Sequence, residues 1–177
     1  MSLESLVPAA PLRIVVMGVC GAGKSTIGLL LAQALGLPFV EGDGLHPPRN
    51  VALMAAGTPL TDDDRQGWLQ AVAGVLAQAE PPGVVVSCSA LKRRYRDLLR
   101  ASAPGLRLVH LCARPALLAQ RLQGRRGHYM PASLLQSQLD ALEPPQADEQ
   151  AYTAEVSDAP SLVVAQLMHR IRLSTSR

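Results

Sequence analysis

The sequence predicts an α/β fold in which a parallel sheet of five strands is flanked by helices in three layers. Short apolar runs rich in Val and Ile alternate along the chain with longer segments of helical period, which is the pattern of βαβ units. The 177 residues suffice for one domain with a substantial core, but not for two. We therefore expect a single domain over residues 12–177, after a poorly ordered tail of residues 1–11.

The predicted strands and helices alternate, and turn-forming residues separate them. The expected strands are 13–17, 38–41, 83–88, 106–112 and 152–157. The expected helices are 24–35, 49–56, 62–79, 90–101, 115–122, 131–142 and 160–173. Gly36 and Gly57 follow predicted helix ends, and Pro115, Pro131 and Pro160 stand at helix starts.

Composition limits the class of protein. Hydrophobic residues make up 48% of the chain and charged residues 18%, as in ordinary globular proteins. The net charge of +3 is concentrated at 92–100 and 121–126, and with only 3% aromatic residues this favours a site for a small anion over a nucleic-acid surface. Three cysteines without paired spacing indicate reduced thiols, and from the acidic Glu4 and the short apolar runs we expect neither a secretory signal nor a membrane-spanning segment. We expect a soluble, cytoplasmic protein with no nucleic-acid or membrane partner.

Residues 18–25 read GVCGAGKS and match the phosphate-loop motif GxxxxGKS between a predicted strand and a predicted helix. Its glycines let backbone N–H groups surround phosphate oxygens, and the helix presents its positive end to the same anion. In such a loop the lysine reaches the β and γ phosphates and the serine hydroxyl ligates Mg²⁺. The alternative, a turn that only joins strand and helix, is disfavoured by the full motif in this context. The expected ATP contacts are Gly18, Val19, Cys20, Gly21, Ala22, Gly23, Lys24, Ser25 and Thr26.

Carboxylates follow the second predicted strand rather than the third. The third ends in Ser87, Cys88 and Ser89, where a P-loop ATPase or GTPase would place its metal-orienting Asp. Glu41 and Asp43 stand two residues apart after the second strand and would point the same way from an extended chain. This displacement, together with the missing NKxD guanine motif, favours a small-metabolite kinase over the larger P-loop classes.

Five sequence blocks give the chain a more specific resemblance. They are GVCGAGKS, EGDGLHPPRNVALMAAGTPLTDDDRQGWL, SCSALKRRYRDLLR, RLQGRRGHYM and LEPPQADE. In their order and spacing they resemble the gluconokinase family, whose fold is that of shikimate kinase and the nucleoside monophosphate kinases. The blocks span nearly all of the chain after residue 12. Glu41 stands where some members have Asp, which keeps the charge and bears on metal geometry.

The resemblance implies that ATP, with Mg²⁺, phosphorylates D-gluconate at its terminal hydroxyl to give 6-phospho-D-gluconate. It implies an acceptor-binding region at about 43–80 and a lid at about 121–133. The catalytic residues would be Lys24, Asp43, which orients the attacking hydroxyl, and Arg125. Ser25 would hold the metal directly and Glu41 through water. The resemblance is also compatible with a homodimer.

Acceptor recognition calls for one fork-shaped cation and several polar side chains. Arg49 is expected to hold the substrate carboxylate, because a guanidinium matches two oxygens. The acidic run 62–64 could serve only as an acidic helix start, which the helix macrodipole favours. We expect this for one or two of the three acids and choose Asp63 as the ligand. Arg93, Arg94 and Arg96 are expected to form a solvated helix face. The remaining expected acceptor ligands are Asp43, His46, Arg65, Lys92 and His128.

The lid is expected to close over ATP and exclude water. By its position Arg121 should lie along the adenine, with Arg125 on the phosphates. Which of Arg125, Arg126 and His128 contacts the transferred phosphate stays open. Pro160, in the loop after the fifth strand, is expected to border the adenine ring.

Two alternative functions have the same phosphate loop. One is a P-loop kinase for another small acceptor, such as shikimate or a nucleoside monophosphate; the blocks DGLHPPRN and LTDDDR favour gluconate instead. The other is a non-catalytic nucleotide-binding switch, which the acceptor-type loops, the lid and the missing guanine motif disfavour.

Overall fold

The computed structural model describes residues 10–124 and 132–175. It confirms the predicted α/β fold: five parallel strands form one sheet in the order β2-β3-β1-β4-β5. The ends of each strand agree with the prediction within two residues. The strands are β1 (Leu12–Met17), β2 (Phe39–Glu41), β3 (Gly83–Ser87), β4 (Arg107–Cys112) and β5 (Tyr152–Glu155).

The seven predicted helices are present, together with two 3-10 turns that were not predicted. The helices are α1 (Lys24–Leu35), α2 (Pro48–Ala55), α3 (Asp62–Ala77), α4 (Arg93–Ser102), α5 (Pro115–Gln123), α6 (Ala132–Ala141) and α7 (Pro160–Thr175), and the turns are η1 (Gly42–Leu45) and η2 (Ala147–Glu149). The start of α4 was predicted three residues too early. Ala90 has a φ of 42°, which a right-handed helix cannot contain, so the helix begins only after Lys92. Within the described part of the chain, no helix combines the length and apolar character needed to cross a membrane.

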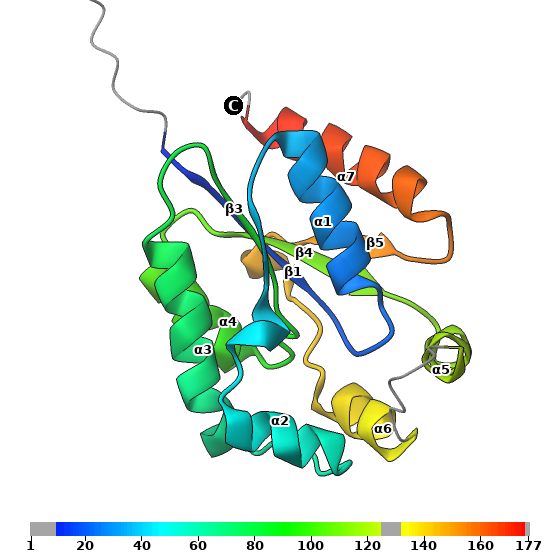
Figure 1. Ribbon diagram of the computed structural model, residues 1–177. Helices are drawn as coiled ribbons and strands as arrows, with labels where there is room; N and C mark the ends of the chain where they lie inside the picture. Colours follow the sequence, from blue (N-terminus) through cyan, green and yellow to red (C-terminus); the bar gives the residue numbers. More distant parts are fainter. Residues whose placement is uncertain (1–9, 125–131, 176–177) are drawn as a thin grey trace, which may run out of the picture.

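Helices cover both faces of the sheet (Figure 1). Along β1, Ile14 and Val16 point into the core beneath α1 and α7, while Val15 and Met17 point into the core beneath α3 and α4. This alternation follows from the two-residue period of a strand. Because both faces are buried, the central strands are apolar throughout.

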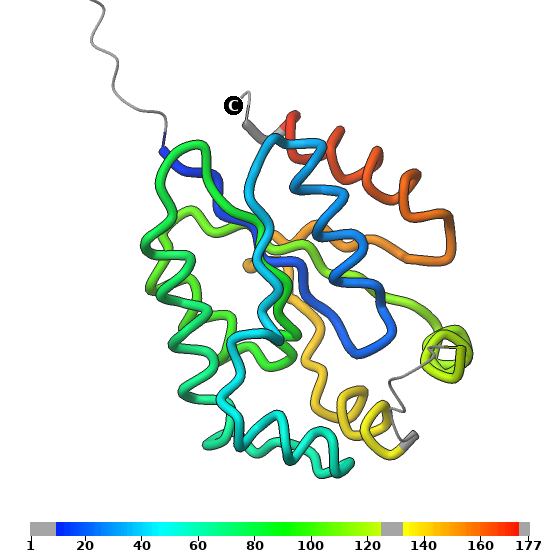
Figure 2. Tube along the Cα trace, viewed as in Figure 1, coloured from blue at the N-terminus to red at the C-terminus, as the bar shows by residue number. Residues whose placement is uncertain are grey.

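The carboxyl ends of the strands meet at one edge, where ligands bind in open α/β sheets. The chain can be followed there in Figure 2: β1 runs into the loop before α1, and β2 runs into η1. The segment after β3 holds the phosphate loop in place. The Gly18 N–H donates to the Ser89 carbonyl at 3.3 Å, and the Cys88 N–H donates to the Val16 carbonyl at 3.0 Å.

Candidate active site

The phosphate loop depends on glycines for its shape. Gly18, Gly21 and Gly23 all have positive φ, and a Cβ at Gly18 would lie 2.6 Å from the Leu111 carbonyl oxygen. Helix α1 starts at Lys24 with no acidic residue in its first turn, and no side chain among the described residues caps its amides. The N-terminal N–H groups of α1 therefore remain available to an anion.

The predicted phosphate and metal ligands lie together at the start of α1. The Lys24 ammonium donates to the Val19 carbonyl at 3.1 Å, which folds the side chain back over the loop. Ser25 and Thr26 are exposed on the first turn of α1. The structure thus has this ammonium and two hydroxyl groups on consecutive residues, directly after the loop.

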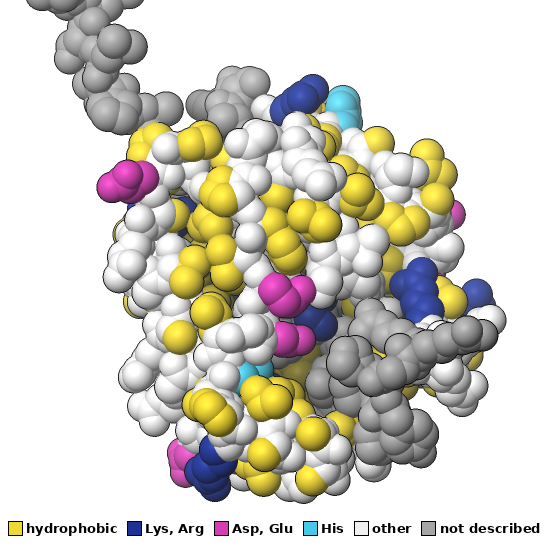
Figure 3. Space-filling view, viewed as in Figure 1, with side chains coloured by type: hydrophobic (Ala, Val, Ile, Leu, Met, Phe, Trp, Pro, Cys, Tyr) yellow, Lys and Arg dark blue, Asp and Glu magenta, His cyan; other side chains and the backbone are white. Residues whose placement is uncertain are grey.

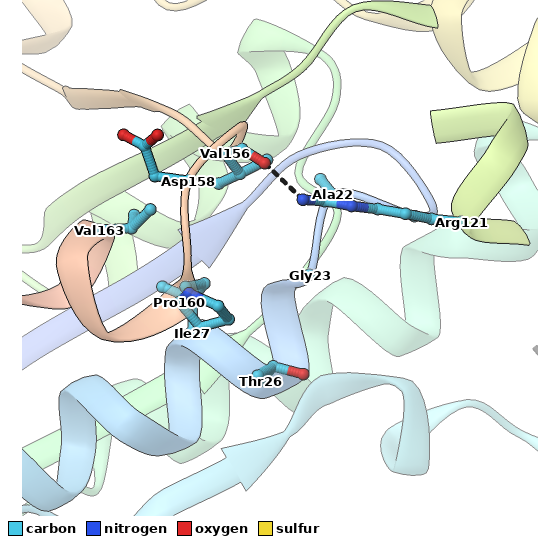
Figure 4. A pocket seen from close by; sticks show the side chains of 10 residues that line it. Ala22, Gly23, Thr26, Ile27, Arg121, Val156, Asp158, Pro160 and Val163 are labelled. Atoms are coloured by element: carbon cyan, nitrogen blue, oxygen red, sulfur yellow. Dashed lines mark hydrogen bonds between the residues drawn. The ribbon is translucent and has the colours of Figure 1, made fainter. Parts of the chain in front are cut away.

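A cavity of about 280 Å³ adjoins the loop on the side of β5 and α7 (Figure 4). Arg121 reaches into it from α5 and donates from Nη2 to the Val156 carbonyl at 2.5 Å. Arg121 and Pro160, the two residues expected beside the adenine, both line this cavity; their contact with adenine stays a prediction. The cavity is lined by Gly21, Ala22, Gly23, Thr26, Ile27, Arg121, Val156, Asp158, Pro160 and Val163.

The carboxylates after β2 are held differently from the prediction. Glu41 accepts a hydrogen bond from the Ser87 hydroxyl, which itself accepts from the Gly42 N–H at 3.1 Å. The chain then turns at once into η1, so the expectation of an extended chain through Asp43 was wrong, and Asp43 lies exposed on that turn. Sequence reasoning missed the role of Ser87, although a polar residue ending an apolar strand was a usable signal.

Charged groups from three elements act on Cys88, just after β3. Burial raises the pKa of the Cys88 thiol to about 12, and among the charges that act on it Asp43 raises the value further while Lys24 and Arg65 lower it. All three side chains therefore lie close enough to the carboxyl edge for their charges to act on this thiol. Acidic, basic and histidine side chains are visible near the middle of the face in Figure 3, above α2.

His46 lies beside these charges as a neutral ring. It stacks on Trp68 with 4.3 Å between ring centroids, and the Trp68 Nε1–H donates to the Gly42 carbonyl at 2.7 Å. Asn50 Nδ2 donates to His46 Nδ1 at 3.3 Å and to the Asp64 carbonyl at 2.7 Å. Burial lowers the pKa of His46. Because Nδ1 accepts, the proton of the neutral ring lies on Nε2, which can donate to a ligand.

A second cavity, of about 290 Å³, lies between the start of α3, the start of α4 and α6. Both carboxylate oxygens of Asp62 accept from the Lys92 ammonium at 3.0 Å, and Tyr95 and Arg94 also bond to this carboxylate. The Tyr95 hydroxyl, followed by Arg94 and Lys92, lowers the pKa of Asp62, so it is ionised. The lining residues are Leu60, Thr61, Asp62, Arg65, Leu91, Lys92, Tyr95, Ser137 and Ala141.

Arg65 and Lys92, both expected as acceptor ligands, line this cavity, and the acid that lines it is Asp62 and not Asp63. Asp63 is exposed on the first turn of α3. Asp64 caps α3: it accepts from the Thr61 N–H at 2.9 Å, and its own N–H donates to the Thr61 hydroxyl at 3.2 Å. The three acids thus have three different environments, which their equivalent places in the sequence run did not distinguish.

Of two arginines singled out from the sequence, one is placed differently from the prediction. The Arg49 side chain is 78% exposed, lies 3.3 Å from Asp64 and does not line the second cavity, and its contact with the substrate carboxylate stays a prediction. Arg96, expected on a solvated face, is completely buried. It bonds to both carboxylate oxygens of Glu149, at 2.6 and 2.8 Å, and to the carbonyls of Ala90 and Leu91 at 3.1 Å each.

The buried Arg96 supports the loop that carries Lys92. Its guanidinium holds the two carbonyls just before Lys92, and η2 packs over α4 to bring Glu149 to it. Arg93 and Arg94 do remain partly exposed, as predicted. The three remaining lid candidates, Arg125, Arg126 and His128, lie outside the described residues.

The phosphate loop, the five-stranded parallel sheet and the two cavities at its carboxyl edge define a P-loop kinase. Residues 20–171 match the shikimate kinase family. A shikimate kinase from Bacteroides thetaiotaomicron has the same fold at 21% identity, with a TM-score of 0.65, over 91% of this chain and 98% of that one.

Relatives with higher sequence identity define the family more narrowly. A gluconokinase from Gluconobacter oxydans (strain 621H) is 44% identical over 96% of both chains. The thermosensitive gluconokinase of Escherichia coli K12 is 43% identical over 77% of this chain and 74% of its own. The crystal structure of a gluconokinase from Sinorhizobium meliloti 1021 is 47% identical, with a TM-score of 0.82, over 93% of this chain and 97% of that one. The chain belongs to the gluconokinase family.

Proposed function

We propose that this protein transfers the γ-phosphoryl group of ATP to the terminal hydroxyl of D-gluconate, giving 6-phospho-D-gluconate. Similarity to a gluconokinase over 96% of the chain supports this proposal most directly. The geometry supports it as well, because the phosphate loop lies at the same edge of the sheet as a polar cavity. That cavity is lined by two cationic side chains, Arg65 and Lys92, and by the acid Asp62.

The phosphate side acts by positioning and by charge. Phosphoryl transfer needs little covalent help from the protein, since the developing charge on the phosphoryl oxygens is the main obstacle. The amides of the loop and of the first turn of α1 would hold the β and γ phosphates, and Lys24 would move from the Val19 carbonyl to those oxygens. The cavity lined by Arg121 and Pro160 would take the adenosine.

The acceptor hydroxyl would lie between Asp43 and the γ phosphate. Asp43 is exposed on η1 and can accept a hydrogen bond from this hydroxyl and later take its proton. The neutral His46 beside it can donate from Nε2 to a neighbouring hydroxyl of the sugar acid. Stacking on Trp68 keeps the ring in that orientation.

The second cavity would bind the rest of the sugar acid. Arg65 and Lys92 bring positive charge to it, which suits a carboxylate. The ionised Asp62 accepts hydrogen bonds, which suits hydroxyl groups. This assignment replaces Arg49 and Asp63 by residues that line the cavity.

The expected metal ligands, Ser25 and Glu41, suit a Mg²⁺ ion that is bound mainly through the nucleotide. Among residues 10–124 and 132–175, no group of three or more His, Cys, Asp or Glu side chains could hold a metal alone. Mg²⁺ commonly keeps several waters and takes one or two protein ligands beside phosphates. The exposed Ser25 hydroxyl would be the direct ligand and Glu41 would act through water. The ion would neutralise charge on the phosphates.

A coupled assay of ADP release tests the proposal. Purified protein with MgATP is offered D-gluconate, shikimate, AMP and related sugar acids separately. We expect ADP release to depend strongly on gluconate and 6-phospho-D-gluconate to accumulate. Equal turnover with shikimate or AMP would reassign the acceptor, and nucleotide binding without gluconate-dependent turnover would favour the nucleotide switch.

A further inference from the structure

The peptide unit that joins Val19 to Cys20 in the phosphate loop is bound at both ends. Its carbonyl accepts from the Lys24 ammonium at 3.1 Å and from the Ala22 N–H at 3.3 Å. Its N–H donates to the side-chain oxygen Oε1 of Gln138 at 2.7 Å. A peptide unit is rigid, with its N–H and C=O pointing in opposite directions. An acceptor that holds the N–H therefore also fixes the carbonyl that receives Lys24.

Gln138 comes from α6, which lies far from the loop in sequence and next to it in space (Figure 1). Two contacts hold α6 against the rest of the domain. Leu135, one turn earlier, packs in the same core cluster as Val19 and Cys20. Just beyond the helix, the N–H of Glu143 donates to the Leu91 carbonyl at 2.9 Å. The Gln138 oxygen is thus presented to the loop by a helix that packs on the core through Leu135 and is held just beyond its C-terminal end.

We propose that Gln138 is a positioning residue for phosphoryl transfer, acting on Lys24 through the Val19–Cys20 peptide. Without an acceptor for its N–H, this peptide can rotate, and the carbonyl turns away from the ammonium. Lys24 then samples more rotamers before ATP arrives, and the loop must reorder when the phosphates bind. The inference rests on the proposed function in one respect, that the phosphates of ATP occupy this loop.

The kinetic test compares Gln138→Met with Gln70→Met. Methionine keeps the length of the side chain but removes the amide oxygen. Gln70 is exposed on α3, so its substitution makes the same chemical change away from both cavities. We expect Gln138→Met to lower kcat/KM for ATP about tenfold, the effect of losing one hydrogen bond that holds the loop and Lys24 ordered before the phosphates bind. The KM for gluconate should stay unchanged, and Gln70→Met should match the wild type.

Two readouts do not depend on turnover. Amide hydrogen exchange at Cys20 should become faster in Gln138→Met and stay slow in Gln138→Glu, which retains an acceptor oxygen. The affinity for MgADP should fall in Gln138→Met. If the methionine variant does not fold, Gln138→Asn serves instead, since it keeps the amide but is too short to reach the loop.

The outcomes separate this inference from the proposed function. A lower melting temperature with unchanged kcat/KM for ATP would overturn the inference, because a purely structural role predicts that result. Unchanged Cys20 exchange in Gln138→Met would overturn it as well. Absence of gluconate turnover in the wild type would reject the proposed function, while Cys20 exchange and MgADP affinity would still decide the role of Gln138.

Discussion

The proposed nucleotide side and acceptor side of the site differ in the groups that form them. The nucleotide side consists mostly of backbone: glycines with positive φ, the amides of α1 and the carbonyl of Val156. The proposed acceptor side consists of side chains: Lys92, Arg94 and Tyr95 bind Asp62 at the start of α3, and α6 lines the same cavity. A site made of backbone groups tolerates many side-chain substitutions but few changes of backbone conformation. A site made of side chains is altered by the substitution of any one of them. Substitutions should therefore have different signatures on the two sides.

Loss of the candidate base should have the largest effect. Asp43→Asn keeps the size of the side chain but removes its ability to take the hydroxyl proton, so kcat should fall by about 10²–10⁴-fold. The affinity for MgADP should be nearly intact, because Asp43 lies on η1 and not in the phosphate loop. Steady-state kinetics and calorimetric titration check both parts. A near-normal kcat would remove Asp43 from the mechanism.

Loss of the loop lysine should affect binding and rate together. Lys24→Ala removes the ammonium that would follow the phosphates into the transition state, and kcat should fall by about 10²–10³-fold. Nucleotide affinity should fall too, unlike in Asp43→Asn. Circular dichroism and thermal unfolding serve as the control. If Lys24→Ala were unfolded, the lysine would have a structural role and the contrast with Asp43 would not hold.

The buried ion pair beneath the acceptor side should control stability and its dependence on pH. The Arg96 guanidinium is the main cause that lowers the pKa of Glu149 from 4.5 to about 2. The folded state therefore binds this proton less tightly than the unfolded state, and the ionised carboxylate stabilises the fold above about pH 4.5. This contribution is lost as the pH falls towards 2. At neutral pH, Glu149→Gln should lower the free energy of unfolding by about 3 kcal/mol.

Urea denaturation of wild type and Glu149→Gln from pH 7 to acid measures this difference. The two stabilities should converge as the pH falls. Asp97→Asn is the matched control, because Asp97 is an exposed acid that pairs with Arg100, as Glu149 also does. The control should change stability by less than about 1 kcal/mol. Parallel profiles for wild type and Glu149→Gln would contradict the assigned role.

The smallest effect should distinguish two adjacent acids. Asp62→Asn removes the carboxylate that holds Lys92 and accepts from Tyr95, so the KM for gluconate should rise about tenfold. Asp63→Asn makes the same change one residue away at an exposed position and should leave this KM unchanged. Because Asp62→Asn also loses the bonds to Lys92, Arg94 and Tyr95, thermal unfolding of both variants serves as the control that each remains folded at the assay temperature. The reverse result would restore the sequence-based choice of Asp63.

The difference between the two sides also explains what could be predicted. The phosphate loop is a local motif whose shape follows from nine consecutive residues, 18–26, so its place between β1 and α1 was predicted correctly. The strands were found from their apolar runs, which both buried faces require. Arg65 and Lys92, two of the predicted acceptor ligands, line the second cavity, whereas Asp63 and Arg49 do not, and the contacts of all four with substrate stay predictions. The three acids at 62–64 and the four basic residues at 92–96 show charge without showing which side chain points inward.

The sequence alone determined the α/β fold, the nucleotide loop and the kinase class, because each depends on local periodicity or on one contiguous motif. Only the tertiary structure decided which acid enters the acceptor cavity, that Arg96 is buried on Glu149, and that Gln138 holds the Val19–Cys20 peptide. These contacts join residues between about 30 and 120 positions apart. Such pairings depend on how α3, α4, α6 and η2 pack together, and no local pattern in the chain encodes that packing.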